Sequence, residues 1–147
     1  MIVDTTKTTL LTREQALAQR KWVLIDAKNE YLGRVAVRIA NLLRGKDKVN
    51  FTPSYDCGEF VVVINSDQLK LSGNKAKKEF WYRHSGYPGG LKQRSGAEML
   101  EKYSDKLLTL AVKRMLPKNR YLSRALLEKL KVYKGSEHPH QAQLSNS

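Results

Sequence analysis

The chain has 147 residues, which favours a single domain, and its 41% hydrophobic content is sufficient for a core. Lysine and arginine number 27 against 14 acidic residues, and the net charge of +13 favours polyanionic partners, either nucleic acid or an anionic membrane surface. No apolar run approaches the roughly 18 to 20 residues that span a bilayer, so no membrane partner is expected. Cys57 is the only cysteine, which excludes an internal disulfide, and the three histidines do not stand at metal-ligand spacing.

The two ends of the chain are expected to lie outside the folded domain. Residues 1–20 are polar and rich in threonine, and we interpret them as a flexible N-terminal arm. The domain is expected over residues 21–140, followed by a polar C-terminal tail at residues 141–147. Met1–Lys7 has no basic head followed by an apolar block, so no secretory signal is expected and a cytosolic location fits.

Two apolar runs and the helical pattern between them predict a βαβ unit. Residues 22–25 and 60–64 are short apolar runs typical of strands buried on both faces. Between them, residues 31–44 carry apolar side chains at helical spacing, with Asn29 as a candidate N-cap and Gly45 as a stop. Strand, helix and strand in this order predict parallel strands joined by a right-handed crossover.

The second half of the chain adds two weaker strands and a helical end. Residues 69–72 alternate apolar and polar side chains and residues 80–82 are aromatic, so they predict a third and a fourth strand. Ser95 begins a capping-box pattern, followed by one apolar stripe over residues 99–103 and a second over residues 107–115 that ends at Pro117. Residues 122–130 carry the last stripe. The sequence therefore predicts one α/β domain. Its core is expected to include Val35, Ile39, Val62, Ile64, Leu108 and Leu126.

Positive charge is concentrated in two blocks. Residues 75–94 hold six cations opposed by one acid, and residues 113–134 hold eight cations opposed by one acid. Solvated helix faces normally interleave both signs, so these blocks favour a shared polyanionic partner. Binding of such a partner releases counterions, and its affinity falls steeply with salt. Because arginine holds two phosphate oxygens or stacks on a base, Arg83, Arg120 and Arg124 are the preferred contacts.

A glycine-rich loop lies inside the first block. The run Tyr82–Lys92 combines three glycines, one proline and two tyrosines with three groups that can carry positive charge. Glycine lets the backbone approach another molecule closely, the cations attract phosphate, and tyrosines can stack on bases. The loop therefore predicts a surface that lies against a nucleic-acid backbone. The alternative is a tight, solvated surface turn that happens to be basic.

Catalysis is poorly supported. A nucleophile pair of Cys57 and His84 would need the two side chains to converge, and nothing in the sequence brings them together. The glycines of the loop also fail the phosphate-loop pattern, which needs a following Lys-Ser or Lys-Thr on a helix. We therefore expect no enzyme, no small-molecule substrate and no cofactor.

Five segments, taken in order along the chain, resemble one known family. They are residues 32–46, 60–65, 82–92, 115–120 and 130–140. The family is the bacterial large-subunit ribosomal protein L-thirteen, and the resemblance extends from about Trp22 to His140. It implies a three-layer α/β/α domain with a small, mostly parallel, four-stranded sheet, together with a basic C-terminal helical region.

The resemblance also implies a structural role in the cytoplasmic ribosome. Such a protein binds large-subunit ribosomal RNA beside neighbouring large-subunit ribosomal proteins, and it supports early subunit assembly and translation without catalysis. The glycine loop and residues 115–124 would be the main RNA-facing elements. The candidate RNA-binding residues are Arg34, Arg38, Lys46, Arg83, His84, Ser85, Gly86, Tyr87, Gly89, Gly90, Lys92, Lys118, Asn119, Arg120, Arg124 and Lys131.

Three departures from the family pattern and two rival functions remain. Cys57 stands where threonine is usual, and Ser54 stands where histidine is common. The connection over residues 119–124 is one residue longer, with Ser123 where glycine is typical. Because serine reaches positive φ less readily than glycine, a changed turn is expected at Ser123. The first rival function is a free regulatory RNA-binding protein, for example a translational repressor of its own mRNA. The second is an enzyme that uses Cys57.

Overall fold

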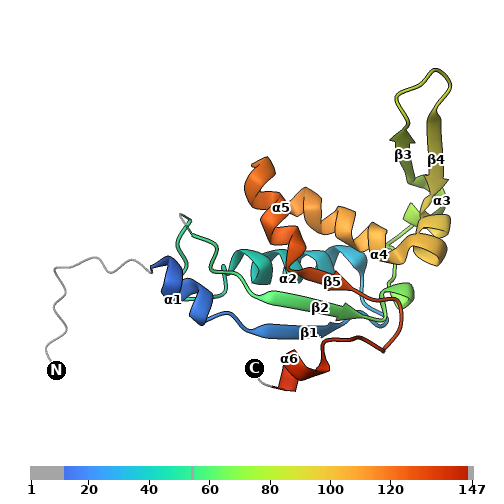
Figure 1. The fold of residues 1–147 in the computed structure, drawn as a ribbon. Coiled ribbons are helices and arrows are strands. Elements are labelled where there is room, and N and C mark those ends of the chain that lie inside the picture. Colours follow the sequence, from blue (N-terminus) through green and yellow to red (C-terminus); the bar gives the residue numbers. More distant parts are fainter. Residues whose placement is uncertain (1–11, 54, 146–147) are drawn as a thin grey trace, which may run out of the picture.

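A three-stranded parallel sheet forms the centre of the computed structural model, which describes residues 12–53 and 55–145 (Figure 1). Strands β1 (Trp22–Asp26), β2 (Phe60–Ile64) and β5 (Leu130–Val132) pair in the order β1-β2-β5. The register places Leu24 opposite Val62 and Val62 opposite Lys131. The predicted strand–helix–strand unit with parallel strands is confirmed.

Helices α2 (Leu32–Arg44), α4 (Gly96–Met115) and α5 (Arg120–Glu128) cover one face of this sheet (Figure 1). Helix α2 ends where predicted, at Gly45, whose φ is +74°. A Cβ at Gly45 would lie 2.7 Å from the Cys57 carbonyl oxygen, so glycine is required there for space as well as for φ. The helices and the sheet enclose the core.

The core contains most of the residues expected in it. Val35, Ile39 and Leu108 are fully buried between the helices and the sheet, and Leu126 is 2% exposed. Val62 is also fully buried, although it faces the other side of the sheet. Ile64 is only half-buried, because it is the last residue of β2.

The opposite face of the sheet is only partly covered. Helix α6 (Gln141–Ser145) lies on this side (Figure 1), and the His140 ring lies 5.2 Å from the Trp22 ring between centroids. Leu24 on the same face is 43% exposed, because β1 is an edge strand. The expectation that both apolar runs are buried on both faces is therefore right for β2 and wrong for β1.

The expected third and fourth strands lie outside this sheet. Residues 69–72 contribute only an isolated bridge between Lys70 and Tyr31. Strand β3 (Phe80–His84) pairs antiparallel with β4 (Leu91–Ser95) and forms a separate hairpin. Within the described residues the parallel sheet thus has three strands rather than four. Its third strand, β5, has three residues, which is too short a run for a period-2 pattern to be recognised.

Part of the expected N-terminal arm is helical. Helix α1 (Arg13–Ala18) begins with a capping box in which Thr12 and Gln15 exchange side-chain and backbone hydrogen bonds. Ala16 in this helix is 2% exposed, so the segment packs against the domain. The remainder of the arm, residues 1–11, lies outside the described residues and stays a prediction.

Two local expectations about helix ends are wrong. Asn29 does not cap α2, because its backbone has a φ of +61° and Tyr31 occupies the N-cap without a side-chain hydrogen bond. Ser123 makes no turn. It lies inside α5, where its N–H donates to the Asn119 carbonyl at 2.9 Å, so no positive φ is needed. Ser95 does cap α4, accepting from the Glu98 N–H at 3.3 Å.

The remaining elements connect the two halves of the fold. A short 3₁₀ turn, η1 (Ser66–Gln68), and helix α3 (Lys75–Lys78) lie between β2 and the hairpin. Helix α4 contains a kink at Tyr103, whose φ and ψ are −133° and 38°, so the two expected apolar stripes join in one bent helix. Asn65, at a φ of +56°, donates a side-chain hydrogen bond to Asp26, and this bond lowers the pKa of Asp26. None of the described helices is long and apolar enough to cross a membrane.

Candidate nucleic-acid interface

The β3–β4 hairpin projects from the domain and carries the largest group of candidate residues (Figure 1). Its ladder places Arg83 directly opposite Lys92 and Trp81 opposite Arg94, all on one face. Like charges directly opposite each other in a ladder repel and destabilise the pairing. An anion bound over this face would relieve that repulsion.

The hairpin tip is a turn defined by its own hydrogen bonds. Gly86 has a φ of +95°, and its N–H donates to His84 Nδ1 at 2.9 Å. A Cβ on Gly90 would lie 2.0 Å from Ser85 Oγ, so the turn closes tightly around that hydroxyl. Tyr87, with 75% of its surface exposed, presents its ring to solvent. His84, Ser85 and Gly90 therefore shape the turn, and Tyr87 is left exposed at its tip.

A second basic surface lies at the corner between α4 and α5. It is a groove of about 750 Å³ whose cationic lining residues are Lys113, Arg114, Lys118, Arg120 and Arg124. Glu128 lies 3.6 Å from Arg124 Nε in an exposed pair, which binds the arginine only weakly. The Asn119 side chain is already engaged, because its Oδ1 accepts from the N–H groups of Tyr121 and Leu122 and caps α5.

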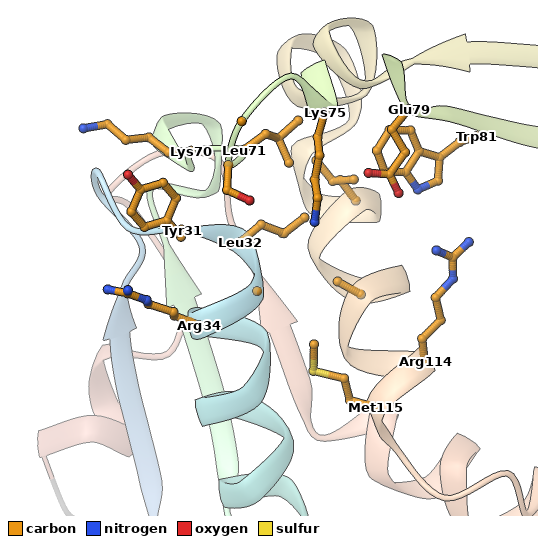
Figure 2. Close-up of a pocket in the computed structure, with 15 residues that line it drawn as sticks. Tyr31, Leu32, Arg34, Lys70, Leu71, Lys75, Glu79, Trp81, Arg114 and Met115 are labelled. Carbon is orange, nitrogen blue, oxygen red and sulfur yellow. The ribbon is translucent and has the colours of Figure 1, made fainter. Parts of the chain in front are cut away.

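A third basic surface is the pocket between α2 and α4, which we call the interhelical pocket. It has a volume of about 680 Å³ and is open to solvent on one side (Figure 2). Lys75 reaches down into it between the two helices, whereas Arg34 and Lys70 point away at its outer rim (Figure 2). The Arg34 guanidinium lies 5.5 Å from the centre of the Tyr31 ring.

Arg114 joins these surfaces. It lines the interhelical pocket, the groove at the α4–α5 corner, and a further groove of about 700 Å³ beneath the hairpin that also contains Arg83 and Lys92. Sequence reasoning did not select Arg114 or Lys75 among the candidate residues. The only sequence feature that could have indicated these two residues is their place in the two basic blocks. Hydrophobic periodicity does not show that Lys75 and Arg114 line the same pocket.

The remaining candidates lie in three different places. Arg38 and Lys46 are exposed on α2 and just beyond its end, and Gly89 is exposed at the hairpin tip with a φ of +70°. Lys131 is exposed in β5 opposite Val62, on the sheet face turned away from α2. The structure therefore separates Lys131 from the hairpin and from the α4–α5 corner.

One cation of the second block belongs to the interior. Lys129 is 4% exposed, its Nζ lies 2.6 Å from Asp56 Oδ1, and it donates to the Leu43 carbonyl at 3.1 Å. Arg20 binds the same carboxylate at 2.8 Å. Burial lowers the pKa of Lys129, and the hydrogen bond to Asp56 partly offsets this effect. Lys129 therefore links the chain just before β5 to Asp56 and to the end of α2, and its buried ammonium group is not available to a polyanion.

Cys57 and His84 lie in different environments. Cys57 is 1% exposed with its Sγ 3.7 Å from Thr52 Oγ1, whereas His84 ends the exposed strand β3. The thiol thus packs as a small core residue. Over residues 12–53 and 55–145 there is also no group of three or more histidine, cysteine or acidic residues that could hold a metal ion.

The fold and its surface define a class of protein, a small basic α/β domain with a projecting cationic hairpin, of the kind that binds nucleic acid. The sequence model of the family described as Ribosomal protein L13 matches residues 20–139, and the chain belongs to this family. Proteins named large ribosomal subunit protein uL13 are similar over 137 residues. Those of Malacoplasma penetrans, Mycoplasma genitalium and Thermosipho africanus are 57%, 55% and 53% identical, covering 93% of this chain and 93%, 93% and 90% of their own lengths.

Proposed function

We propose that this protein is a structural constituent of the large ribosomal subunit in the cytoplasm, where it binds large-subunit ribosomal RNA without catalysis. It supports early subunit assembly and translation beside neighbouring large-subunit ribosomal proteins. The family membership and the names of the relatives support the assignment. The observation that carries the RNA-binding part is the hairpin ladder, in which Arg83 faces Lys92 and a bound anion would relieve the repulsion.

The RNA-binding surface in this proposal runs from the hairpin to the α4–α5 corner. Arg83, Lys92 and the turn at residues 84–90 would hold phosphates and one stacked base, and Arg120 and Arg124 would hold a second stretch of backbone. Arg34, Arg38 and Lys46 extend the surface along α2, and Lys131 would meet a separate strand. The unit that binds is residues 21–140, and α6, which follows it at Gln141–Ser145, serves as a reduced third layer over the sheet.

Replacing Arg120 and Arg124 together by alanine is expected to weaken binding to large-subunit ribosomal RNA. Both side chains are exposed and support no core contact, so the midpoint of thermal unfolding should change little. Loss of two phosphate contacts should reduce the slope of log K against log salt by about 1.4 to 1.8. Filter binding at several salt concentrations measures the slope, and calorimetry measures the midpoint.

The matched control removes two exposed cations outside the proposed surface, by replacing Arg13 and Lys28 with alanine. It lowers the net charge equally and should leave the salt slope within about 0.5 of the wild type. A loss of thermal stability in the Arg120 and Arg124 variant as large as its loss of affinity would show that these arginines support the fold instead.

Sedimentation separates the proposal from the free regulatory RNA-binding protein. We expect the chain to co-migrate with large subunits in sucrose gradients of cell lysate and to remain with them at high salt. A chain found only in light fractions, or released by modest salt, would favour the rival, including a repressor of its own mRNA.

A further inference from the structure

The interhelical pocket has the size and lining of a site for one nucleotide. Its volume of about 680 Å³ falls within the range of about 300 to 1,000 Å³ that is typical of small-molecule sites. Its floor is apolar and is formed by Leu32, Leu107, Ala111 and Met115 from the two helices. Such a floor accepts the face of a single base, whereas a paired duplex could not enter between α2 and α4.

Charged and polar groups stand over this apolar floor. Figure 2 shows the Lys75 ammonium directed into the space above Leu32 and Met115, and the Arg114 guanidinium directed toward Trp81 at the opposite wall. Both cations line the pocket, so the phosphate of a nucleotide bound there would meet positive charge. Glu79, which lies beside Trp81, offers a carboxylate that accepts hydrogen bonds from ribose hydroxyls or base amino groups (Figure 2).

We propose that the interhelical pocket receives one unpaired nucleotide of the bound RNA, with its phosphate on Lys75 and Arg114 and its base over the apolar floor. This inference rests on the proposed function, because it takes the bound polyanion to be RNA. Proteins recognise RNA mainly at unpaired nucleotides, whose bases can leave the helix and stack on protein side chains. Arg114 also lines the two grooves on either side, so the nucleotide would leave a strand that already follows the basic surface.

The first test compares Lys75→Glu with Lys77→Glu in binding to large-subunit ribosomal RNA. Both lysines are exposed in helix α3 and both substitutions change the charge equally, but only Lys75 lines the pocket. The Lys77 variant therefore measures the general loss of positive charge. We expect Lys75→Glu to weaken binding about tenfold more than Lys77→Glu, which is close to the effect of losing one hydrogen bond to a charged group.

The second test fills the pocket without changing its charge. Met115 is 42% exposed and lines the pocket, so Met115→Trp should occupy the space of the base and weaken RNA binding about tenfold. Val37→Trp is the control, because Val37 is 50% exposed on α2 and does not line the pocket, and it should bind as the wild type does. Circular dichroism of both variants confirms that the fold is kept.

Two probes identify the source of the nucleotide. Ultraviolet crosslinking of the wild-type complex is expected to leave a nucleotide of the RNA on Trp81 or Tyr31, and adenosine monophosphate at millimolar concentration should not displace the RNA. Tight binding of adenosine monophosphate in the absence of RNA would overturn the assignment in favour of a free nucleotide. Equal RNA affinity of each variant and its control would overturn the assignment of the pocket and leave the proposed function intact. A wild-type chain that does not bind the RNA would overturn the proposed function itself.

Discussion

Gly58→Ala is expected to lower the free energy of unfolding by about 3 kcal/mol, because the added methyl group has no space. A Cβ at this position would lie 1.7 Å from the Leu43 carbonyl oxygen and 2.7 Å from Lys129 Nζ. The first of these atoms belongs to the backbone of α2 and cannot rotate away, so the chain around Asp56 has to move. Urea denaturation followed by circular dichroism measures the change.

Gly33→Ala is the matched control for that substitution. No atom lies within 4 Å of a Cβ built at Gly33, which occupies the first turn of α2. Alanine is the better helix former by about 0.5 to 1 kcal/mol, so this variant should be as stable as the wild type or slightly more stable. Equal effects of the two substitutions would show that close packing against Leu43 is not what selects glycine at position 58.

Lys129→Met is expected to lower the free energy of unfolding by about 3 kcal/mol. Methionine keeps most of the buried stem, so the loss comes from the ammonium group, which binds Asp56 and the Leu43 carbonyl. The carboxylate and the carbonyl would then lie in a poorly hydrated place with fewer partners. Arg20 remains on Asp56, which keeps the loss at the lower end of the range for a broken buried pair.

Lys131→Met provides the comparison for Lys129, two residues along the chain and in the same part of the fold. Its side chain is exposed, so its substitution should change the free energy of unfolding by no more than about 0.5 kcal/mol. The same denaturation experiment measures both variants. If both lost the same stability, the pair between Lys129 and Asp56 would contribute nothing beyond general charge.

Much of the fold could be predicted because its signals are local. The apolar stripe of α2 and its stop at Gly45 occupy consecutive residues, and the five-residue run of β2 is apolar throughout. Strand β5 could not be predicted in this way, since it has three residues and depends on pairing with β2. The aromatic run at residue 80 was recognised as a strand, but its partner β4 is polar and only the ladder reveals it.

The sequence predicted which segments carry the cations of the candidate interface. It did not predict how the fold arranges the individual side chains. Charge density and the glycine loop drew attention to the hairpin and to the α4–α5 corner, where the structure shows exposed cations. The sequence could not reveal that Lys129 is buried, because its partner Asp56 is 73 positions away. It could not reveal the interhelical pocket either, because Lys75 lies in α3 and Arg114 in α4, and only the fold brings both to one pocket.

The late position of β5 has a consequence for the order of events during synthesis. The third strand begins at Leu130, 35 positions after β4 ends at Ser95. At a synthesis rate of about 5 to 20 residues per second, the hairpin leaves the synthesising ribosome about 2 to 7 seconds before β5 and before Lys129, which pairs with Asp56. A nascent chain therefore presents its cationic hairpin to RNA before β5 has completed the sheet. The sheet can then be completed in a chain that is already bound to RNA.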